Sequence, residues 1–153
     1  MSARELLLLD TSIVVHIFRG GAVGQRVDRA YGLRERPERP LISVVTVGEV
    51  LGFGRQRDWA DKKMAALRRL LTELVVVDIN HAAVLECYAD LRGRDRKGGW
   101  NLSQNDTWIA ATAVATGSLL LTTDRDFERV DQTILRSVYI DPVATEGAGP
   151  TSS

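Results

Sequence analysis

Four carboxylate side chains stand at positions from which they could act on one ligand. Asp10 and Asp124 each directly follow a short run of residues typical of a buried strand. We expect Glu49 and Asp106 in the first turns of two helices. Carboxylates held close together repel one another and raise their own pKa values, and a hard divalent cation such as Mg²⁺ or Mn²⁺ relieves that repulsion. The four acids therefore indicate a metal site.

Such a site suits phosphodiester hydrolysis, which needs an activated water and neutralisation of the phosphate charge. Two metal ions held by acids alone supply both. We expect Asp10 and Asp106 to be the principal ligands, with Glu49 and Asp124 either completing the set or holding metal-bound water. Hydroxyl groups beside the acids are expected to orient the carboxylates: those of Thr11, Ser12 and Thr123.

Helix capping offers a simpler explanation for each acid taken singly. Thr46 with Glu49, and Ser103 with Asp106, both fit the capping-box pattern of a hydroxyl followed three residues later by an acid. The aspartates at the two strand ends could likewise cap the helices that follow them. Capping alone, however, does not require an aspartate at the end of two separate strands. The pattern as a whole favours a shared site.

The elements that must position these acids alternate between strand and helix. Near-continuous Leu, Val and Ile predict strands buried on both faces at Glu5–Asp10, Leu41–Thr46, Leu74–Ile79, Leu119–Thr123 and Ser137–Ile140. Helical patterns cover Ile13–Arg19, Ala22–Leu33, Val47–Leu74 with a break near Gly52 and Gly54, Ala82–Gly93 and Asp106–Thr116. This alternation predicts a doubly wound α/β fold with a mainly parallel central sheet flanked by helices. Ligands bind outside the carboxyl ends of the strands in such sheets, which is where the acids would meet.

Length and composition are consistent with this prediction and argue against several other classes of protein. The chain has 153 residues, which fits one domain over 1–141 followed by an expected disordered tail over 142–153. Its single cysteine and two separated histidines argue against a disulfide framework, a multi-cysteine zinc site and a His-x-x-x-His metal pair. No apolar run approaches the ~18 residues of a membrane span, and none forms a signal-peptide core. We therefore expect a cytoplasmic protein that does not enter a membrane.

Four motifs occur in a fixed order along the chain. They read Leu-Leu-Asp10-Thr-Ser, Val-Gly-Glu49, Asn105-Asp106-Thr-Trp-Ile-Ala-Ala and Leu-Leu-Thr-Thr123-Asp124-Arg-Asp126-Phe127. Together they resemble the four acidic motifs of PIN-domain ribonucleases. Their spacing and the chain length are similar to those of the VapC-type toxins of bacterial toxin–antitoxin pairs. The resemblance extends from Leu6 to Tyr139.

The resemblance implies a Mg²⁺-dependent endoribonuclease, with Mn²⁺ as a possible substitute, whose substrate is RNA and whose inhibitor is a cognate antitoxin protein. It implies that Asp10, Glu49, Asp106 and Asp124 form the catalytic and metal-binding quartet. Asp126 would be a fifth metal ligand, and the division of roles between Asp124 and Asp126 stays open. The resemblance also implies a homodimer.

Other classes fit the residues less well. A phospho-receiver signalling domain also places acids at strand ends, but it needs a lysine after a late strand, and no lysine is so placed. A haloacid-dehalogenase-like phosphatase needs Asp-x-Asp after the first strand, where this chain has Asp10-Thr11-Ser12. A non-catalytic Mg²⁺-binding interaction domain remains as the alternative. Among the tryptophans, Trp108 is the best candidate for an exposed ring that could stack an RNA base.

Overall fold

Five short strands form one parallel sheet in the computed structural model, which describes residues 5–143. The strands are β1 (Leu7–Leu9), β2 (Leu41–Ser43), β3 (Val75–Val77), β4 (Leu119–Thr122) and β5 (Ser137–Tyr139), in the spatial order β3-β2-β1-β4-β5. All four neighbouring pairs are parallel. The chain winds outward from β1 to β3 and then resumes on the other side of β1 with β4. The β1–β4 pair is therefore the switch point of the sheet, where a ligand crevice is expected.

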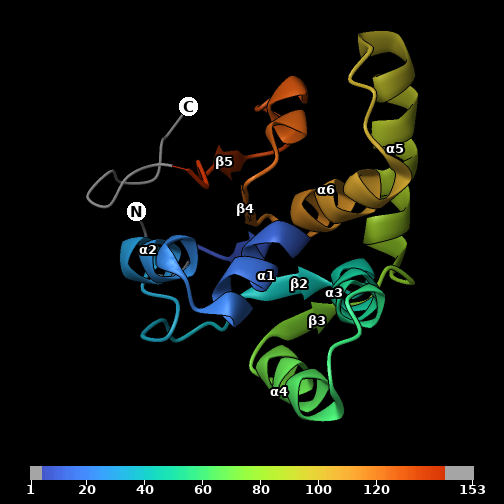
Figure 1. Cartoon of the computed structure of the whole chain (residues 1–153). Helices are drawn as coiled ribbons and strands as arrows, with labels where there is room; N and C mark the ends of the chain where they lie inside the picture. Colours follow the sequence, from blue (N-terminus) through green and yellow to red (C-terminus); the bar gives the residue numbers. More distant parts are fainter. Residues whose placement is uncertain (1–4, 144–153) are drawn as a thin grey trace.

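Helices cover both faces of this sheet (Figure 1). They are α1 (Thr11–Arg19), α2 (Ala22–Tyr31), α3 (Val44–Gln56), α4 (Asp61–Thr72), α5 (Ala82–Gly98) and α6 (Gln104–Thr116), with a short 3-10 helix η1 (Arg125–Arg129) after β4. The doubly wound α/β prediction is confirmed. None of the helices within 5–143 is long and apolar enough to cross a membrane. Residues 144–153 of the predicted tail lie outside the described residues.

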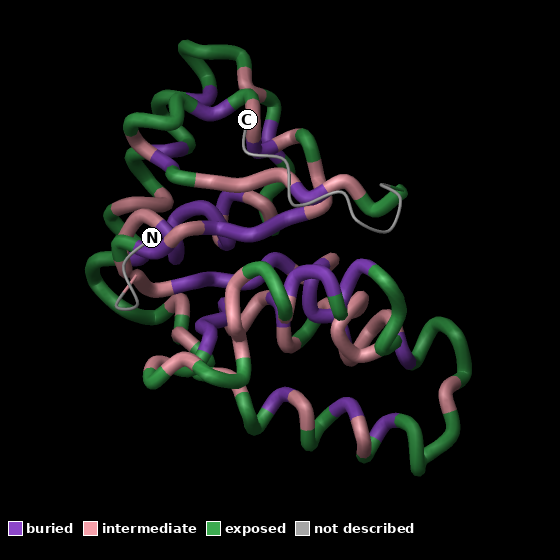
Figure 2. The backbone as a smooth tube through the Cα atoms, turned by 90° about the vertical axis from the view of Figure 1, so that its left-hand side faces the viewer, coloured by how far each residue is buried: buried purple, intermediate pink, exposed green. Residues whose placement is uncertain are grey.

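The strand alternation divides the core into two apolar layers. Leu7 and Leu9 face one layer, which includes residues of α1 to α4, whereas Leu8 faces the other, with α5, α6 and η1. Leu8 is opposite both Leu41 and Leu120 in the parallel register, and all three belong to the second layer. Buried backbone accordingly runs through the central strands in Figure 2. A sheet filled on both faces holds the carboxyl ends of β1 and β4 rigidly side by side.

The prediction that every strand is buried on both faces is wrong for β3. Val75 and Val76 keep 37% and 45% of their surface exposed. The reason is position, because β3 is at the edge of the sheet and pairs only with β2. An all-valine strand has the same sequence pattern at an edge as at the centre.

The predicted start of α3 is also wrong. The helix begins at Val44, and the Ser43 hydroxyl caps it by accepting a hydrogen bond from the Val45 N–H at 3.1 Å. Thr46 is therefore inside the helix and not its cap, and Glu49 is in the second turn rather than the first. The β-branched run at this point suited a strand locally, but the Ser43 cap ends the strand early.

The later helix boundaries differ as well. Gly52 and Gly54 lie within α3, and the break before α4 falls at residues 57–60, where Asp58 adopts a positive φ of 53°. The helix α5 continues to Gly98, beyond the predicted end at Gly93. Neither change alters which elements end at the predicted site.

Candidate active site

Asp10 is the most constrained of the predicted site residues. It follows β1, keeps only 5% of its surface exposed and caps α1, because its Oδ1 accepts a hydrogen bond from the Thr11 N–H at 2.8 Å. Its Oδ2 accepts hydrogen bonds from the hydroxyls of Thr122 at 2.7 Å and Ser12 at 3.3 Å. The capping prediction is therefore confirmed for Asp10, and the same carboxylate lies at the strand end where the sequence predicted a metal ligand. Its orientation is fixed by donors from α1 and β4.

The hydroxyl that orients Asp10 from β4 belongs to Thr122, and this corrects the prediction of Thr123. Thr122 is buried and its Oγ1 also accepts a hydrogen bond from the Asp124 N–H at 2.9 Å, so it links two of the acids. Thr123 contributes its backbone N–H, which donates to the Ser12 hydroxyl at 3.2 Å. Thr122 is the last residue of β4 and Thr123 follows it outside the strand, so the two threonines have different surroundings.

Glu49 reaches the site from α3 and is held by two other helices. Its Oε1 accepts a hydrogen bond from the Thr11 hydroxyl at 2.6 Å, and its Oε2 accepts one from the Asn105 amide at 3.2 Å. The Thr11 hydroxyl also lies 3.0 Å from that of Thr46. Thr11 therefore contacts one of the predicted acids, and its orienting role stays a prediction. Thr46 and Asn105 were missed, although Asn105 directly precedes the predicted Asp106.

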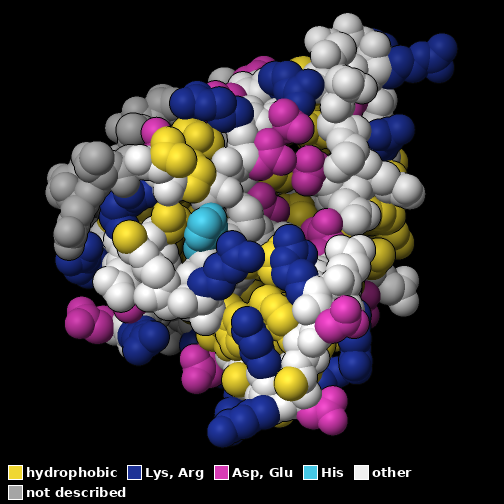
Figure 3. Space-filling model, viewed as in Figure 1, with side chains coloured by type: hydrophobic (Ala, Val, Ile, Leu, Met, Phe, Trp, Pro, Cys, Tyr) yellow, Lys and Arg dark blue, Asp and Glu magenta, His cyan; other side chains and the backbone are white. Residues whose placement is uncertain are grey.

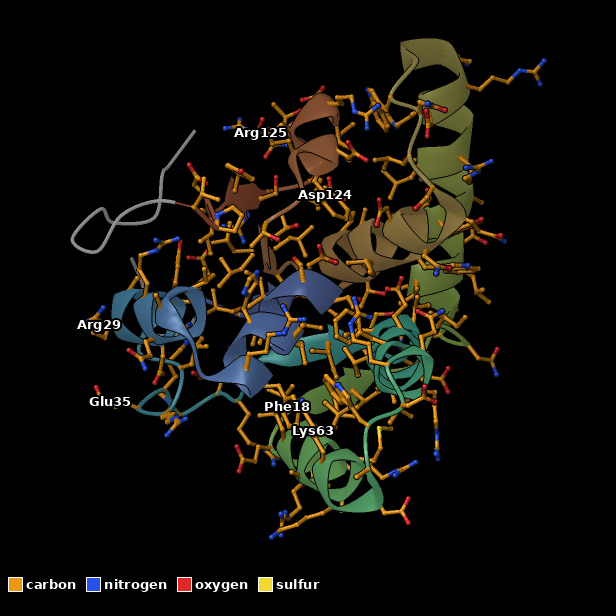
Figure 4. The ribbon with its side chains drawn as sticks, viewed as in Figure 1. Phe18, Arg29, Glu35, Lys63, Asp124 and Arg125 are labelled. Carbon is orange, nitrogen blue, oxygen red and sulfur yellow. The ribbon has the colours of Figure 1, made fainter. Side chains whose placement is uncertain are left out.

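Three further acids come together beside these two. Asp106, Asp124 and Asp126 each offer a carboxylate oxygen, and these oxygens lie within 4.8 Å of one another. The Ser103 hydroxyl caps α6 by accepting from the Asp106 N–H at 3.1 Å, and Asp124 caps η1 by accepting from the Asp126 N–H at 2.8 Å. Asp126 also pairs with Arg129 at 2.5 Å. Figure 4 labels Asp124 where β4 passes into η1.

The pKa values of two of these acids are raised by burial and by the charges of the neighbouring acids. Burial raises the pKa of Asp10 to about 6, and the charges of Asp124 and Glu49 add to that effect. Burial likewise raises the pKa of Asp106 to about 6, assisted by the charges of Asp10, Asp124 and Glu49. The four acids of the predicted quartet therefore converge on one place. Acidic side chains gather in the upper middle of the face shown in Figure 3.

The donor set fits a hard divalent cation. The grouped ligands are carboxylate oxygens of Asp106, in the first turn of α6, and of Asp124 and Asp126, which follow β4. Oxygen-only sets of this kind suit Mg²⁺ and Mn²⁺. Asp10 and Asp106, whose pKa values are raised, would lose their protons and the mutual repulsion of their charges when a cation binds.

The Trp108 ring is not open on both faces. It stacks on the ring of Tyr88 with centroids 3.7 Å apart, so one face of it is occupied by packing between α5 and α6. Trp59 lies between α3 and α4, where the Lys63 ammonium is 4.1 Å from the centroid of its ring. The sequence pattern predicted a helix over this residue and gave no sign of the contact.

Comparisons with known proteins agree with this geometry. A family model of the PIN domain matches residues 7–132. Ribonuclease VapC4 of Mycobacterium tuberculosis (strain ATCC 25618 / H37Rv) is 40% identical over 94 residues, which cover 56% of this chain and 67% of that protein.

Solved structures of toxin–antitoxin proteins share the fold. VapBC2 from Rickettsia felis, bound to a DNA fragment from its promoter, superposes with a TM-score of 0.76 at 20% identity, covering 89% of this chain and 99% of that one. VapBC-5 from Mycobacterium tuberculosis gives a TM-score of 0.63 at 23% identity, covering 87% and 97%. The predicted PIN-like fold is confirmed.

Proposed function

The chain belongs to the PIN domain family, and on that premise we propose that it is a metal-dependent endoribonuclease. The observation that carries the proposal is the convergence of Asp10, Glu49, Asp106 and Asp124 from four separate elements, with two of their pKa values raised to about 6. The ribonuclease name of the 40% identical relative supports RNA as the substrate.

We assign the acids two different roles, which are the binding of metal ions and the orientation of water. Asp10 and Asp106, together with Asp124 and Asp126, would hold Mg²⁺, or Mn²⁺ in its place. Such ions supply an activated water and neutralise the negative charge that the phosphate gains during hydrolysis. Glu49 is held on both oxygens by other side chains, and we assign it the role of orienting the attacking water.

Hydrogen bonds from neighbouring side chains fix the orientation of two of the acids. Thr122 and Ser12 fix the Asp10 carboxylate, and Thr11 fixes Glu49. Because each carboxylate is held before substrate arrives, little reorganisation is needed during the reaction. The Arg129 guanidinium bound to Asp126 partly neutralises that acid, which would make Asp126 the weakest of the ligands.

The biological role we propose is that of the toxin in a toxin–antitoxin pair, acting in the cytoplasm. The VapBC structures that share this fold support an antitoxin as protein partner. A group of carboxylates is a natural receptor for guanidinium, so the antitoxin would inhibit by placing an arginine among them. A homodimer is part of the same proposal.

The decisive experiment incubates the purified chain with an RNA pool and Mg²⁺, with EDTA as the metal-free arm. We expect cleavage only with the metal, and fragments with 5′-phosphate and 3′-hydroxyl ends, since water is the nucleophile. Asp10→Asn should abolish cleavage, whereas Glu86→Gln, which removes an exposed acid on α5, should not. Cleavage that persists in EDTA, or fragments with cyclic phosphates, would contradict the mechanism.

A separate experiment with acetyl phosphate tests the non-catalytic alternative. Acetyl phosphate should leave the chain unmodified, because no lysine follows a late strand to assist phosphoryl transfer. Stable phosphorylation of an aspartate, together with intact RNA in the first experiment, would instead identify a phospho-receiver domain.

A further inference from the structure

A groove of about 600 Å³ leads away from the acids along α3. At one end it is lined by Thr11, Glu49 and Asn105, which belong to the candidate active site. At the other end it is lined by Phe53 and Gln56, farther along the helix. The groove therefore connects the acids with a second part of the surface.

Glycines form the floor of this groove. Gly48 and Gly52 are one helical turn apart on α3, and both line it. A Cβ atom built at either position would meet nothing within 4 Å. The helix backbone is thus open on this side, which lets the backbone of another molecule approach closely. The backbone conformation does not require glycine at either position, because both lie within a regular helix. Packing does not require it either, because an added Cβ atom would meet no neighbour.

The far end of the groove adjoins a group of aromatic rings and cations that we call the cation–aromatic cluster. It comes from α1, α3, α4 and the loop before α4, and consists of Phe18, Arg19, Phe53, Arg57, Trp59 and Lys63. Figure 4 labels Phe18 and Lys63 in the lower middle of the view, between the ribbons of α1 and α4. In Figure 3, Lys and Arg side chains lie over hydrophobic ones below the acidic group.

The aromatic rings hold the cations in place. The Arg57 guanidinium lies 3.4 Å from the centroid of the Phe53 ring, and that of Arg19 lies 5.3 Å from the same ring. The Lys63 ammonium lies 4.1 Å from the ring of Trp59, which in turn contacts Phe53 edge-on at 5.6 Å. Cations over ring faces are attracted by the ring quadrupole, so they are partly ordered before any ligand binds.

In the described part of the chain, these cations have no acidic partners in ion pairs. Arg19, Arg57 and Lys63 are all exposed, and within residues 5–143 none of them makes an ion pair. Their charge is therefore available to an anion. Lysine and arginine that are ordered, exposed and unpaired are suited to bind phosphate.

On the basis of the proposed ribonuclease function, we infer that the cation–aromatic cluster binds the RNA strand on one side of the bond to be cleaved. Arg19 and Lys63 contact phosphates, and Arg57, backed by Phe53, presents a flat guanidinium on which a base stacks. The strand then follows the glycine floor to the acids. Carboxylates repel phosphate, so a substrate needs cations nearby to hold it, and the groove joins the two parts.

Binding can be measured apart from cleavage. The probe is a fluorescein-labelled, 20-nucleotide single-stranded RNA of mixed sequence, titrated by fluorescence anisotropy in EDTA with the Asp106→Asn variant, which leaves the RNA intact. In this background, Arg19→Gln with Arg57→Gln is compared with Arg68→Gln and Arg69→Gln, two exposed arginines of α4 outside the cluster. Both double variants remove the same charge.

We expect the cluster variant to bind RNA about tenfold more weakly and the control variant to bind like the parent. The slope of log Kd against log salt should also fall by about 0.7 for each phosphate that the variant no longer binds. Lys63→Gln against Lys62→Gln repeats the comparison with neighbouring lysines. Equal affinity of cluster and control variants would overturn the inference and leave the cluster as a surface for a protein partner.

Gly52→Leu separates binding from folding. Leucine forms helix better than glycine and has open space here, so the melting temperature should stay the same or rise. RNA affinity should nevertheless fall several-fold, because the side chain fills the groove. Gly93→Leu, at an open position within α5, should gain stability without losing affinity. Unchanged affinity of Gly52→Leu would exclude the groove as the RNA path.

The two proposals fail in different ways. If the parent cleaves RNA and Asp10→Asn does not, while the cluster variants bind normally, the ribonuclease function stands and only the cluster is wrong. If Asp10→Asn cleaves as well as the parent, the proposed active site itself is wrong, whatever the cluster variants show.

Discussion

At the scale of single residues, Asp10 has two roles that are usually separated. Its Oδ1 caps α1, and its Oδ2 is shared by hydroxyls from α1 and β4. Burial raises its pKa to about 6 despite the hydrogen bonds from Thr122 and Thr11, which lower the pKa. Helix capping alone does not explain why Asp10 lies among other carboxylates, because their charges disfavour its ionised form. This arrangement supports the proposal that the acids bind a divalent cation.

Metal-free stability should therefore depend on pH. The pKa values of Asp10 and Asp106 are about 6 in the folded chain, against an ordinary value near 3.8. Between these values the folded state binds more protons than the unfolded state, so the free energy of unfolding falls as pH rises from about 4 to 7.

Asp106→Asn should remove part of that dependence. In EDTA the variant should match the parent at pH 4 and exceed it at pH 8, by on the order of 1 kcal/mol after solvent screening. Urea denaturation at both pH values measures this. A variant less stable than the parent at pH 8 would show that Asp106 mainly stabilises α6.

The two threonines at the end of β4, Thr122 within it and Thr123 directly after it, give a second test at this scale. Thr122→Val keeps the side-chain shape but removes the hydroxyl that donates to Asp10, so the pKa of Asp10 should rise further. Cleavage should fall about 10–100-fold, and its rise with pH should shift to higher pH. Thr123→Val keeps the backbone N–H that Ser12 uses, and should change cleavage much less. Equal losses in the two variants would argue against the assigned role of Thr122.

At the scale of elements, the site depends on helices that approach closely. Gly24 of α2 lies against the backbone of α1, where an added Cβ would meet the His16 carbonyl oxygen at 2.6 Å and the Ile17 Cα at 2.9 Å. Backbone atoms cannot move aside as a flexible side chain can. Since α1 also carries Thr11 and Ser12, a shift of this helix would reach the acids.

Gly24→Ala should therefore destabilise the chain by about 1–3 kcal/mol. Gly93→Ala, also within a helix but with nothing near its added methyl group, should stabilise it slightly. Thermal unfolding of the two variants provides the comparison. If Gly24→Ala were as stable as Gly93→Ala, the close approach of α1 and α2 would not be rigid.

At the scale of the whole molecule, a group of acidic side chains and a group of basic side chains lie on the same face (Figure 3), although the net charge of the chain is zero. Carboxylates collect where β1, β4 and α6 meet, and cations that make no ion pair within residues 5–143 collect around α3 and α4. In the proposed function, this separation would hold metal cations at one place and a polyanion beside it. Balanced composition is therefore compatible with a strongly polarised surface.

Mg²⁺ should stabilise the whole fold through this site. A ligand that binds only the folded state adds about 2.7 kcal/mol at a concentration 100 times its Kd. We expect Mg²⁺ to raise the melting temperature of the parent and of Glu86→Gln alike, and that of Asp10→Asn much less. An equal rise in all three proteins would place the bound metal away from Asp10.

The sequence alone was enough to predict the acids and the fold class. Apolar runs, capping residues and the acids that follow them are local signals, and their alternation determines a parallel sheet with its ligand site at the strand ends. The predicted quartet of Asp10, Glu49, Asp106 and Asp124 does meet, because the carboxyl ends of parallel strands share one edge of the sheet.

Only the tertiary structure decided which neighbours complete the site. Thr122 rather than Thr123 reaches Asp10 across 112 residues of sequence, and Thr11 reaches Glu49 across 38. The exposure of β3, the second-turn position of Glu49 and the cation–aromatic cluster likewise depend on how separate elements pack. Local patterns set which residue types stand at an element's end. Which side chains touch depends on strand order and helix approach, because those contacts join segments that are far apart in the chain.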